Sequence, residues 1–213
     1  MSRKLSDMTL EELWELFPII LTEHQEAWGR WYDQEKAAIE SVLPADRTVR
    51  ISHVGSTAIP GIWAKPIVDI LVEVTAETDM EQMAALLCDA GWIRMSNSHI
   101  RMSFNKGYTP QGFAEKVFHL HLRHEGDHDE LYFRDYLREH PGAAKDYEKL
   151  KLGLWKKYEH DRDGYTDAKS DFVKRYTEKA RKKYGGRYEK SISDRRTNGR
   201  GEDNGRTGAE NRA

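Results

Sequence analysis

Residues 53–74 read HVGSTAIPGIWAKPIVDILVEV, and this stretch decides the fold. It joins a β-branched run at 49–54 to a second run at 66–74 through a segment punctuated by Gly, Pro and Ser. That punctuation excludes a long helix between the two runs. The second run is almost continuously apolar, which is typical of a strand covered on both faces. We therefore expect two strands joined by a Gly-Ser turn, with the second strand buried.

Hydrophobic spacing predicts further elements on both sides of this stretch. Before it, Thr9 and Glu12 fit a capping box for a short helix ended by Pro18, residues 19–21 fit a brief strand, and 25–43 fit a longer helix. After it, Asp79 caps a helix that ends at Gly91. Three strands are then expected at 92–95, 100–106 and 116–123, and three helices at 128–140, 142–160 and 163–184. Strands followed by helices predict an α+β (α/β) fold, in which helices flank a mixed β-sheet.

The composition fits one sizeable domain followed by a tail. Of 213 residues, 38% are hydrophobic, and a chain of this length buries most of its unfolded surface. We place a single domain at residues 1–184. Residues 185–213 are polar and rich in Gly, Asn, Arg and Asp, so we expect a disordered tail there.

Charge and targeting signals argue against several classes of partner. The 34 basic and 36 acidic residues give a net charge of −2, so no global field draws the chain to nucleic acid or to an anionic membrane. No run reaches the roughly 20 apolar residues needed to span a bilayer, and no secretory signal is visible, so we expect a cytoplasmic protein. The single cysteine, Cys88, cannot form an intramolecular disulfide and is expected to be buried and inert.

Gly55, Ser56 and Thr57 follow the first strand of the opening stretch and could bind phosphate. A strand that ends in Gly-Ser and opens a helical turn exposes backbone N–H groups and a hydroxyl, which suit a phosphate oxygen. The alternative is a tight turn in which Ser56 only caps the residues that follow. These residues alone leave the two interpretations equal.

Asp69 and the pair His119 and His121 are the other candidates for chemistry. An unpaired carboxylate in the apolar strand around Asp69 would cost several kcal/mol, so we expect a basic hydrogen-bonding partner or a cation beside it. The spacing of His119 and His121 places both imidazoles on one strand face, where they could ligate a metal ion or, when protonated, a phosphate. The alternative is an ordinary polar face. His53 and His99 could join such a site, although each alone is more typical of a structural residue.

Four ordered segments resemble the GrpB family. They are the stretch at 53–74, FHLHLR at 118–123, FRDYLREHPGAAKDYEKLK at 133–151 and GYTDAKSDFVKR at 164–175, and the resemblance spans roughly residues 15–184. The resemblance implies a nucleotidyltransferase-like fold, a small mixed sheet flanked by helices with added C-terminal helices. In that superfamily, a Gly-Ser turn precedes a strand with two alternating carboxylates that hold divalent metal ions.

The sequence departs from this pattern at the second carboxylate. Leu71 stands two residues after Asp69, where the resemblance implies an acidic residue. Glu73 shares the strand face, but four residues of strand place it about 13 Å from Asp69, whereas paired catalytic metals lie about 3.5–4 Å apart. Imidazoles at His119 and His121 suit Mn, Zn or Fe better than Mg. We therefore predict at most one divalent cation (Mg, Mn or Zn), held by Asp69, His119 and His121.

Several basic residues could complete a phosphate pocket. The candidates are Lys65, Arg101, Lys106 and Lys169. A structural salt bridge is the alternative for each, and it is the preferred interpretation for Lys65, Lys106 and Glu73. Arg101 lies where members of the resembled family commonly carry an arginine. It is predicted, with Asp69, to be catalytic by neutralising charge that develops during group transfer.

Three hypotheses for function follow. The leading one is a nucleotidyltransferase-like protein that acts on or binds a nucleotide or phosphorylated metabolite. The alternative is a non-catalytic module for the same ligands that has lost the second metal carboxylate. A third is a different metal-dependent enzyme, because two histidines and one carboxylate also describe non-haem iron sites. The residues predicted to hold phosphate are Gly55, Ser56, Thr57, Lys65, Arg101 and Lys169.

Overall fold

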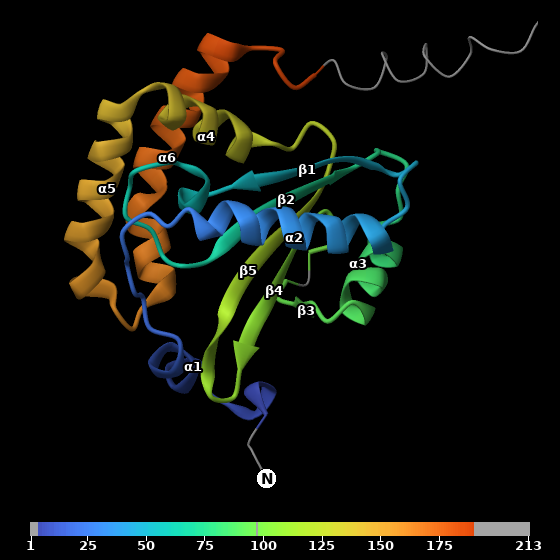
Figure 1. Cartoon of the computed structure of the whole chain (residues 1–213), viewed down its shortest axis with the longest axis horizontal. Coiled ribbons are helices and arrows are strands. Elements are labelled where there is room, and N and C mark those ends of the chain that lie inside the picture. Colours follow the sequence, from blue (N-terminus) through green and yellow to red (C-terminus); the bar gives the residue numbers. More distant parts are fainter. Residues whose placement is uncertain (1–3, 97, 190–213) are drawn as a thin grey trace, which may run out of the picture.

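A five-stranded mixed sheet lies at the centre of the computed structural model, which describes residues 4–96 and 98–189 (Figure 1). The strand order is β1-β2-β5-β4-β3. β2 and β5 run parallel, and the other neighbouring pairs are antiparallel. The apolar run of the opening stretch is therefore an interior strand with a partner on each edge. The strands are β1 (Thr48–Val54), β2 (Val68–Val74), β3 (Ile93–Arg94), β4 (Arg101–Thr109) and β5 (Gly112–His124).

Helices precede, cover and follow this sheet. Predicted capping is confirmed at two of them, because Thr9 and Glu12 form the capping box of α1 and Asp79 accepts backbone hydrogen bonds at the start of α3. Figure 1 shows α4, α5 and α6 grouped together, apart from α2 and α3. The α-helices are α1 (Leu10–Leu16), α2 (Ala27–Val42), α3 (Met80–Asp89), α4 (Asp129–Glu139), α5 (Pro141–Trp155) and α6 (Arg162–Tyr184), and the 3-10 turns are η1 (Leu5–Asp7), η2 (Ser56–Ala58) and η3 (Lys156–Tyr158).

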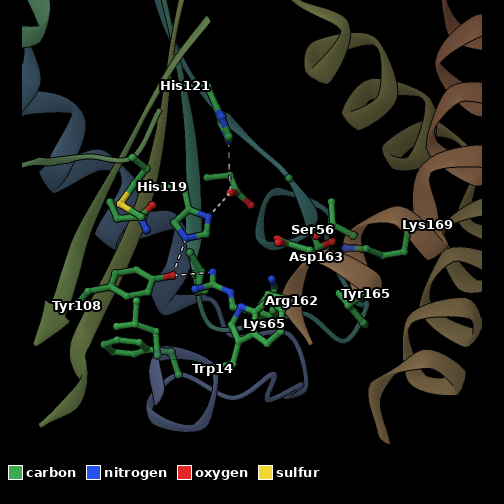
Figure 2. Close-up of a pocket in the computed structure, with 18 of the residues that line it drawn as sticks. Trp14, Ser56, Lys65, Tyr108, His119, His121, Arg162, Asp163, Tyr165 and Lys169 are labelled. Carbon is green, nitrogen blue, oxygen red and sulfur yellow. Dashed lines mark hydrogen bonds and ion pairs between the residues drawn. The ribbon is translucent and has the colours of Figure 1, made fainter. Parts of the chain in front are cut away.

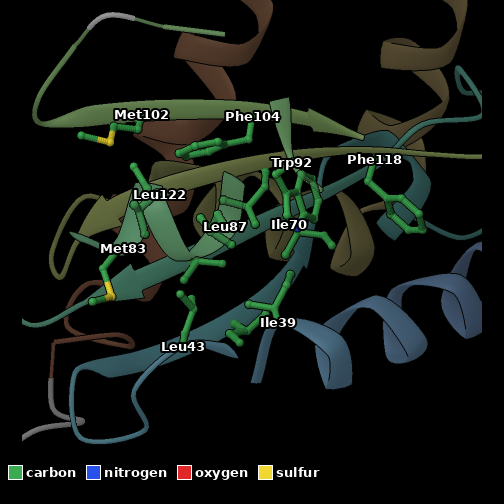
Figure 3. Close-up of a cluster of buried hydrophobic side chains, with 14 of the residues drawn as sticks. Ile39, Leu43, Ile70, Met83, Leu87, Trp92, Met102, Phe104, Phe118 and Leu122 are labelled. Atoms are coloured by element: carbon green, nitrogen blue, oxygen red, sulfur yellow. The ribbon is translucent and has the colours of Figure 1, made fainter. Parts of the chain in front are cut away.

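Strand alternation sends neighbouring side chains of the sheet to two different faces. One, which we call the apolar face, packs against α2 and α3 in a single cluster that includes Trp92, Phe104 and Leu120 (Figure 3). Each large side chain buried there stabilises the fold by about 1.5–3 kcal/mol relative to leaving it in water. The members that come from the central strands are Val68, Ile70, Val72, Val74, Met102, Phe104, Phe118, Leu120 and Leu122.

The opposite face, which we call the polar face, carries the intervening residues of the same strands. On it, Leu71 packs with Val54 and with Leu131 of α4. α5 and α6 then pack on α4 and on the loop that contains Ile59. The helices predicted after the strands therefore cover the polar face and wall off the space beside it.

The predicted α+β architecture is confirmed, with four local differences. Residues 19–21 form no strand; a single bridge joins Thr22 to Ala64 instead. The strand expected at 92–95 is only two residues long, and the helix expected at 142–160 is α5 followed by η3. Cys88 is exposed, not buried, because it lies on the outer side of α3.

Side-chain contacts continue past residue 184, where the predicted domain ends. Arg187 pairs with Asp135 and Glu139, and the Tyr188 hydroxyl donates a hydrogen bond to Asp135. Residues 190–213 of the predicted tail lie outside the described residues. Among the helices of the described chain, none is long and apolar enough to cross a membrane.

Candidate functional site

A pocket of about 770 Å³ lies beside the polar face of the sheet. Its walls come from elements far apart in sequence: Asp69 from β2, His119 from β5, Lys151 from α5, Lys169 from α6 and Trp14 from α1. Figure 2 shows His119, Lys169 and Trp14 around one space. The pocket is therefore assembled only when the sheet and the C-terminal helices pack together.

The Gly-Ser turn enters this pocket directly against Asp69. Gly55 follows Val54, which stands opposite Asp69 in the antiparallel register of β1 and β2. Its φ of 69° lies in the left-handed region, and a Cβ at this position would overlap the Asp69 carboxylate. Glycine is thus required here by both the backbone conformation and the lack of space, and Ser56 follows it on the pocket wall.

Asp69, His119 and His121 meet, as the sequence predicts. Asp69 is the register partner of His119 in the parallel pair β2–β5. Its Oδ1 lies 3.3 Å from Nδ1 of His119 and 3.7 Å from Nε2 of His121. Burial alone would raise the pKa of Asp69, but the hydrogen bonds from His119 and His121 outweigh it and hold the pKa well below its usual range. Asp69 is therefore an ionised carboxylate with basic partners.

A chain of hydrogen bonds continues from His119 to α6. Arg162 donates from its guanidinium to the Tyr108 hydroxyl at 2.9 Å, and that hydroxyl lies 2.7 Å from Nε2 of His119. Because the ionised Asp69 carboxylate can only accept, the imidazole proton of a neutral His119 lies on Nδ1 facing Asp69, and the Tyr108 hydroxyl donates its own proton to Nε2. Burial lowers the pKa of His119, which agrees with a neutral ring.

These contacts bear on the predicted cation. Both ring nitrogens of His119 already face protein groups, and Nδ1 of His121 lies 3.5 Å from the Arg123 guanidinium. Among the described residues, no group of three or more His, Cys, Asp or Glu side chains is arranged to hold a metal ion. The three predicted ligands therefore come together as a carboxylate–imidazole cluster that does not fit a metal in this arrangement. We derive no chemical step through a metal, and metal binding stays a prediction.

Four cations line the pocket without a carboxylate partner: Lys65, Lys151, Arg162 and Lys169. Lys151 is only 2% exposed, and its ammonium donates to the backbone carbonyl of Trp63. Lys65 and Lys169 lie over the ring of Tyr165. Asp163 also lines the pocket. In the described chain, none of the four cations forms an ion pair with Asp163 or with any other carboxylate. The pocket therefore carries an excess of positive charge.

The lysine pKa values reflect this arrangement. Burial first, and the neighbouring cations second, lower the pKa of both Lys65 and Lys151 to about 7. Burial lowers the pKa of Lys169 to about 8, although Asp69 opposes the shift. An anion in the pocket would relieve both effects, because it would add negative charge beside these lysines.

Two predicted phosphate-binding residues are not brought to the pocket. Thr57 is buried and its hydroxyl lies 3.0 Å from Nε2 of His53. Arg101 is on the polar face, but its register partner is Arg123, which lies four residues after His119 in β5. The Arg101 guanidinium donates to both carboxylate oxygens of Asp127. The structure does not bring these two side chains to the pocket, because the Thr57 hydroxyl is used internally and the strand register carries the arginine away; their predicted roles stay predictions.

The remaining candidates are structural. Glu73 is fully buried between Arg50, at 2.6 Å, and His128, at 2.9 Å, and Lys106 pairs with Glu35, so both expected salt bridges are confirmed. Lys65 has no such partner, which corrects the salt bridge preferred for it. His53 stacks on Tyr32 of α2, and His99 is an exposed partner of Glu81; neither joins the site.

Sequence reasoning missed Lys151, Tyr108 and Arg162. A signal existed for Lys151, because it follows Tyr147 by four residues and therefore lies on the buried stripe of α5. A lysine at such a position needs either a partner or a ligand. No comparable signal marks Arg162, which begins α6, or Tyr108 in β4. These two side chains meet only because α6 packs against the sheet, and the sequence does not show that packing.

Comparison with known proteins agrees with this arrangement of motifs. The model of the family described as GrpB protein matches residues 18–179, which is most of the chain. The chain belongs to the GrpB family. The match begins after α1 and includes every strand of the sheet and the turn at Gly55.

Relatives within the GrpB family support the assignment. The glutamate-rich protein GrpB of Alkalihalophilus pseudofirmus is 38% identical over 161 residues, which cover 73% of this chain and 91% of that protein. A UPF0157 protein of Pseudomonas aeruginosa is 39% identical over 153 residues, or 70% of this chain, and the match spans 62% of that protein's length. The crystal structure of conserved protein GrpB from Enterococcus faecalis superposes with a TM-score of 0.66 at 30% identity, covering 78% of this chain and 99% of that one.

Proposed function

We propose that this chain binds the phosphate group of a nucleotide or a phosphorylated metabolite in the pocket beside the polar face. The observation that carries the proposal is the set of cations Lys65, Lys151, Arg162 and Lys169, which line one pocket and form no ion pair with a carboxylate of the described chain. Burying charge without a partner is costly, so such a cluster is explained by an anion that binds from outside.

Ser56 and the lysines have complementary parts in this proposal. Lysine ammonium groups supply compact positive charges, which phosphate oxygens accept well. The hydroxyl of Ser56 can donate a further hydrogen bond from the turn that Gly55 permits. Asp69 lies beside this turn as an ionised group, so the bound phosphate would be held away from it by charge repulsion and toward the lysines.

The residues at the second-carboxylate position and beyond it argue against nucleotidyl transfer by two metal ions. Leu71, at the position of the second carboxylate, is fully buried in an apolar cluster, and Glu73 is held by Arg50 and His128. Two activities remain for the same pocket. Either the Asp69–His119 pair assists a group transfer without a metal pair, or the chain binds its ligand without turnover. Binding is common to both, and it is the part that we propose.

Titration calorimetry with purified protein tests the proposal. ATP, AMP and inorganic pyrophosphate would be titrated with EDTA present and, separately, with Mn²⁺ or Mg²⁺. We expect at least one of them to bind with EDTA present, and Lys151→Met to weaken that binding by about tenfold or more, as loss of one charge-assisted contact does.

Lys149→Met is the matched control, because Lys149 is an exposed lysine on the same helix. It should bind as the wild type does. The proposal is wrong if no phosphate compound binds under any condition, or if Lys151→Met binds as tightly as Lys149→Met. Elemental analysis of the same preparations tests the predicted cation: stoichiometric Mn, Zn or Fe that is lost in Asp69→Asn would establish it. Product formation from ATP would separate an enzyme from a binding module.

A further inference from the structure

The segment before the GrpB match builds one wall of the pocket. The family match begins at residue 18, whereas Leu13 and Trp14 of α1 and Phe17 just after it line the pocket. Leu5 and Leu10 line it as well. All five side chains are apolar or largely so. The part of the pocket that lies outside the family match is therefore chemically unlike the part that contains the lysines.

α1 is held at the pocket by the residues that follow it and not by a buried face. None of its residues is buried. Phe17 anchors the segment, with its ring centroid 4.8 Å from that of Tyr108 and 5.0 Å from that of Phe113. The N–H of Ile19 donates to the carbonyl of Glu159, which ties the segment to the start of α6. The helix is thus positioned over the pocket while its apolar side chains stay available.

Apolar side chains from the sheet edge line the same part of the pocket. Ile93 of β3 and Met95 line it, and they are 44% and 57% exposed. Leu10 of α1 is 52% exposed. Half of the large exposed hydrophobic side chains of the described residues thus lie on this one pocket, since Ile20, Ile100 and Leu152 are the others. Exposed apolar groups that gather in one place mark a binding surface.

The pocket therefore has two chemically distinct ends. Tyr108 belongs to the apolar end through its ring, which packs on Phe17, and its hydroxyl joins the hydrogen-bond chain through His119. Figure 2 shows Tyr108 and Trp14 toward one end, and Ser56 and Lys169 toward the other. Asn105, the register partner of His119, also lines the space and offers an amide donor and acceptor.

We infer that the ligand is a phosphate ester of a flat, aromatic or heteroaromatic group, and that α1 selects this group. The inference rests on the proposed function, because it takes the phosphate to lie at the lysines. The ring then lies against Trp14, Leu13 and Met95, where an aromatic surface buries apolar area and can stack. A nucleoside phosphate and a simple aryl phosphate share this chemistry.

Binding of four compounds tests the inference: AMP, phenyl phosphate, ribose 5-phosphate and inorganic phosphate. We expect AMP or phenyl phosphate to bind about tenfold or more tightly than ribose 5-phosphate, which has the phosphate without a ring. Trp14→Ala should remove most of this preference and leave the affinity for ribose 5-phosphate unchanged. Whichever aromatic ester binds more tightly identifies the source of the ring, a nucleobase or a simple aryl group.

Two further variants keep the test decisive. Glu11→Ala is the matched control, because Glu11 is an exposed residue of α1 that does not line the pocket, and it should keep the preference. Met95→Ser alters the facing apolar wall at an exposed site and should lower the preference even if Trp14→Ala fails to fold. Equal binding of ring-bearing and ring-free phosphates in the wild type overturns this inference alone. If none of the four compounds binds and ATP and pyrophosphate also fail, the proposed function itself is overturned.

Discussion

The two faces of the central sheet are built from the same strands and have opposite contents. On the apolar face, Ile70, Phe104 and Leu120 are fully buried among other apolar side chains. On the polar face, one residue along in each strand, lie Asp69, Asn105 and His119. Because neighbouring residues of a strand point to opposite faces, the hydrophobic cluster and the candidate site lie on opposite sides of the same three strands.

The polar face holds two buried charges that are satisfied in different ways. Glu73 has a basic partner on each carboxylate oxygen, which satisfies its burial. Lys151, at 2% exposure, donates to a backbone carbonyl, and among the described residues it forms no ion pair with a carboxylate. Burial alone therefore does not distinguish the two residues; the missing ion pair is the observation on which the proposed function rests.

The largest expected effect comes from the apolar face. Phe104→Ala would leave a cavity beside Trp92 and Leu120 and should lower the free energy of unfolding by about 3–5 kcal/mol, measured by urea denaturation. Ile100→Ala is the control, because Ile100 is 69% exposed, and it should change stability by less than about 0.5 kcal/mol. A small loss in Phe104→Ala would mean that this face does not carry the stability assigned to it.

Replacing a buried lysine of the polar face should raise the free energy of unfolding, whereas Phe104→Ala lowers it. The pKa of Lys151 is lowered to about 7 in the folded protein, while the unfolded chain keeps the ordinary value of 10.5. Between these pH values the unfolded state binds more protons, so stability should rise as the pH increases from about 7 toward 10.5. Lys151→Met should therefore stabilise the protein at pH 7, by an amount on the order of 1–3 kcal/mol, and flatten this rise.

Denaturation at pH 6.5 and pH 9, with Lys149→Met in parallel, measures this effect. Lys149→Met should keep the wild-type pH dependence. Phosphate affinity should move the other way and fall between these two pH values, because the lysines lose the charge that binds the anion. Stability and affinity that change in the same direction with pH would contradict the proposed use of these lysines.

The smallest expected effect belongs to Arg101. Its side chain is 62% exposed and pairs with Asp127, so Arg101→Ala should cost no more than about 1 kcal/mol of stability. Ligand affinity should stay within twofold of the wild type, since the guanidinium lies outside the pocket. A tenfold loss of affinity in calorimetry would restore the catalytic role that the sequence suggests for it.

Much of the site was predictable because period-two alternation and desolvation act locally. The isolated carboxylate of Asp69 in an apolar strand predicted a basic partner, and the spacing of His119 and His121 predicted a shared face. Arg101 shows where such reasoning ends. Which residue of β4 stands beside His119 depends on the hairpin turn and on the register shift between Lys106 and Tyr108, and no periodicity reports either.

The helical walls were less predictable for a related reason. The sequence indicates that α1 and α6 exist, but their positions over the sheet depend on long-range packing, such as that of Phe17 on Tyr108. Lys151 could have been noticed on its buried stripe, yet whether a carboxylate of the described chain comes within ion-pair distance of it is decided only by the assembled fold. The residues of the candidate site that sequence reasoning missed are those supplied by this packing.

Gly55 has a mechanical consequence for the pocket. The missing methyl group at this residue leaves the volume that the Asp69 carboxylate occupies, so turn and carboxylate are in direct steric contact. A ligand that pushes on Ser56 would therefore displace Asp69 and, through it, the two imidazoles. The Gly-Ser turn and the carboxylate–imidazole cluster thus form one interlocked unit, in which a shift at either part is transmitted to the other by contact between atoms.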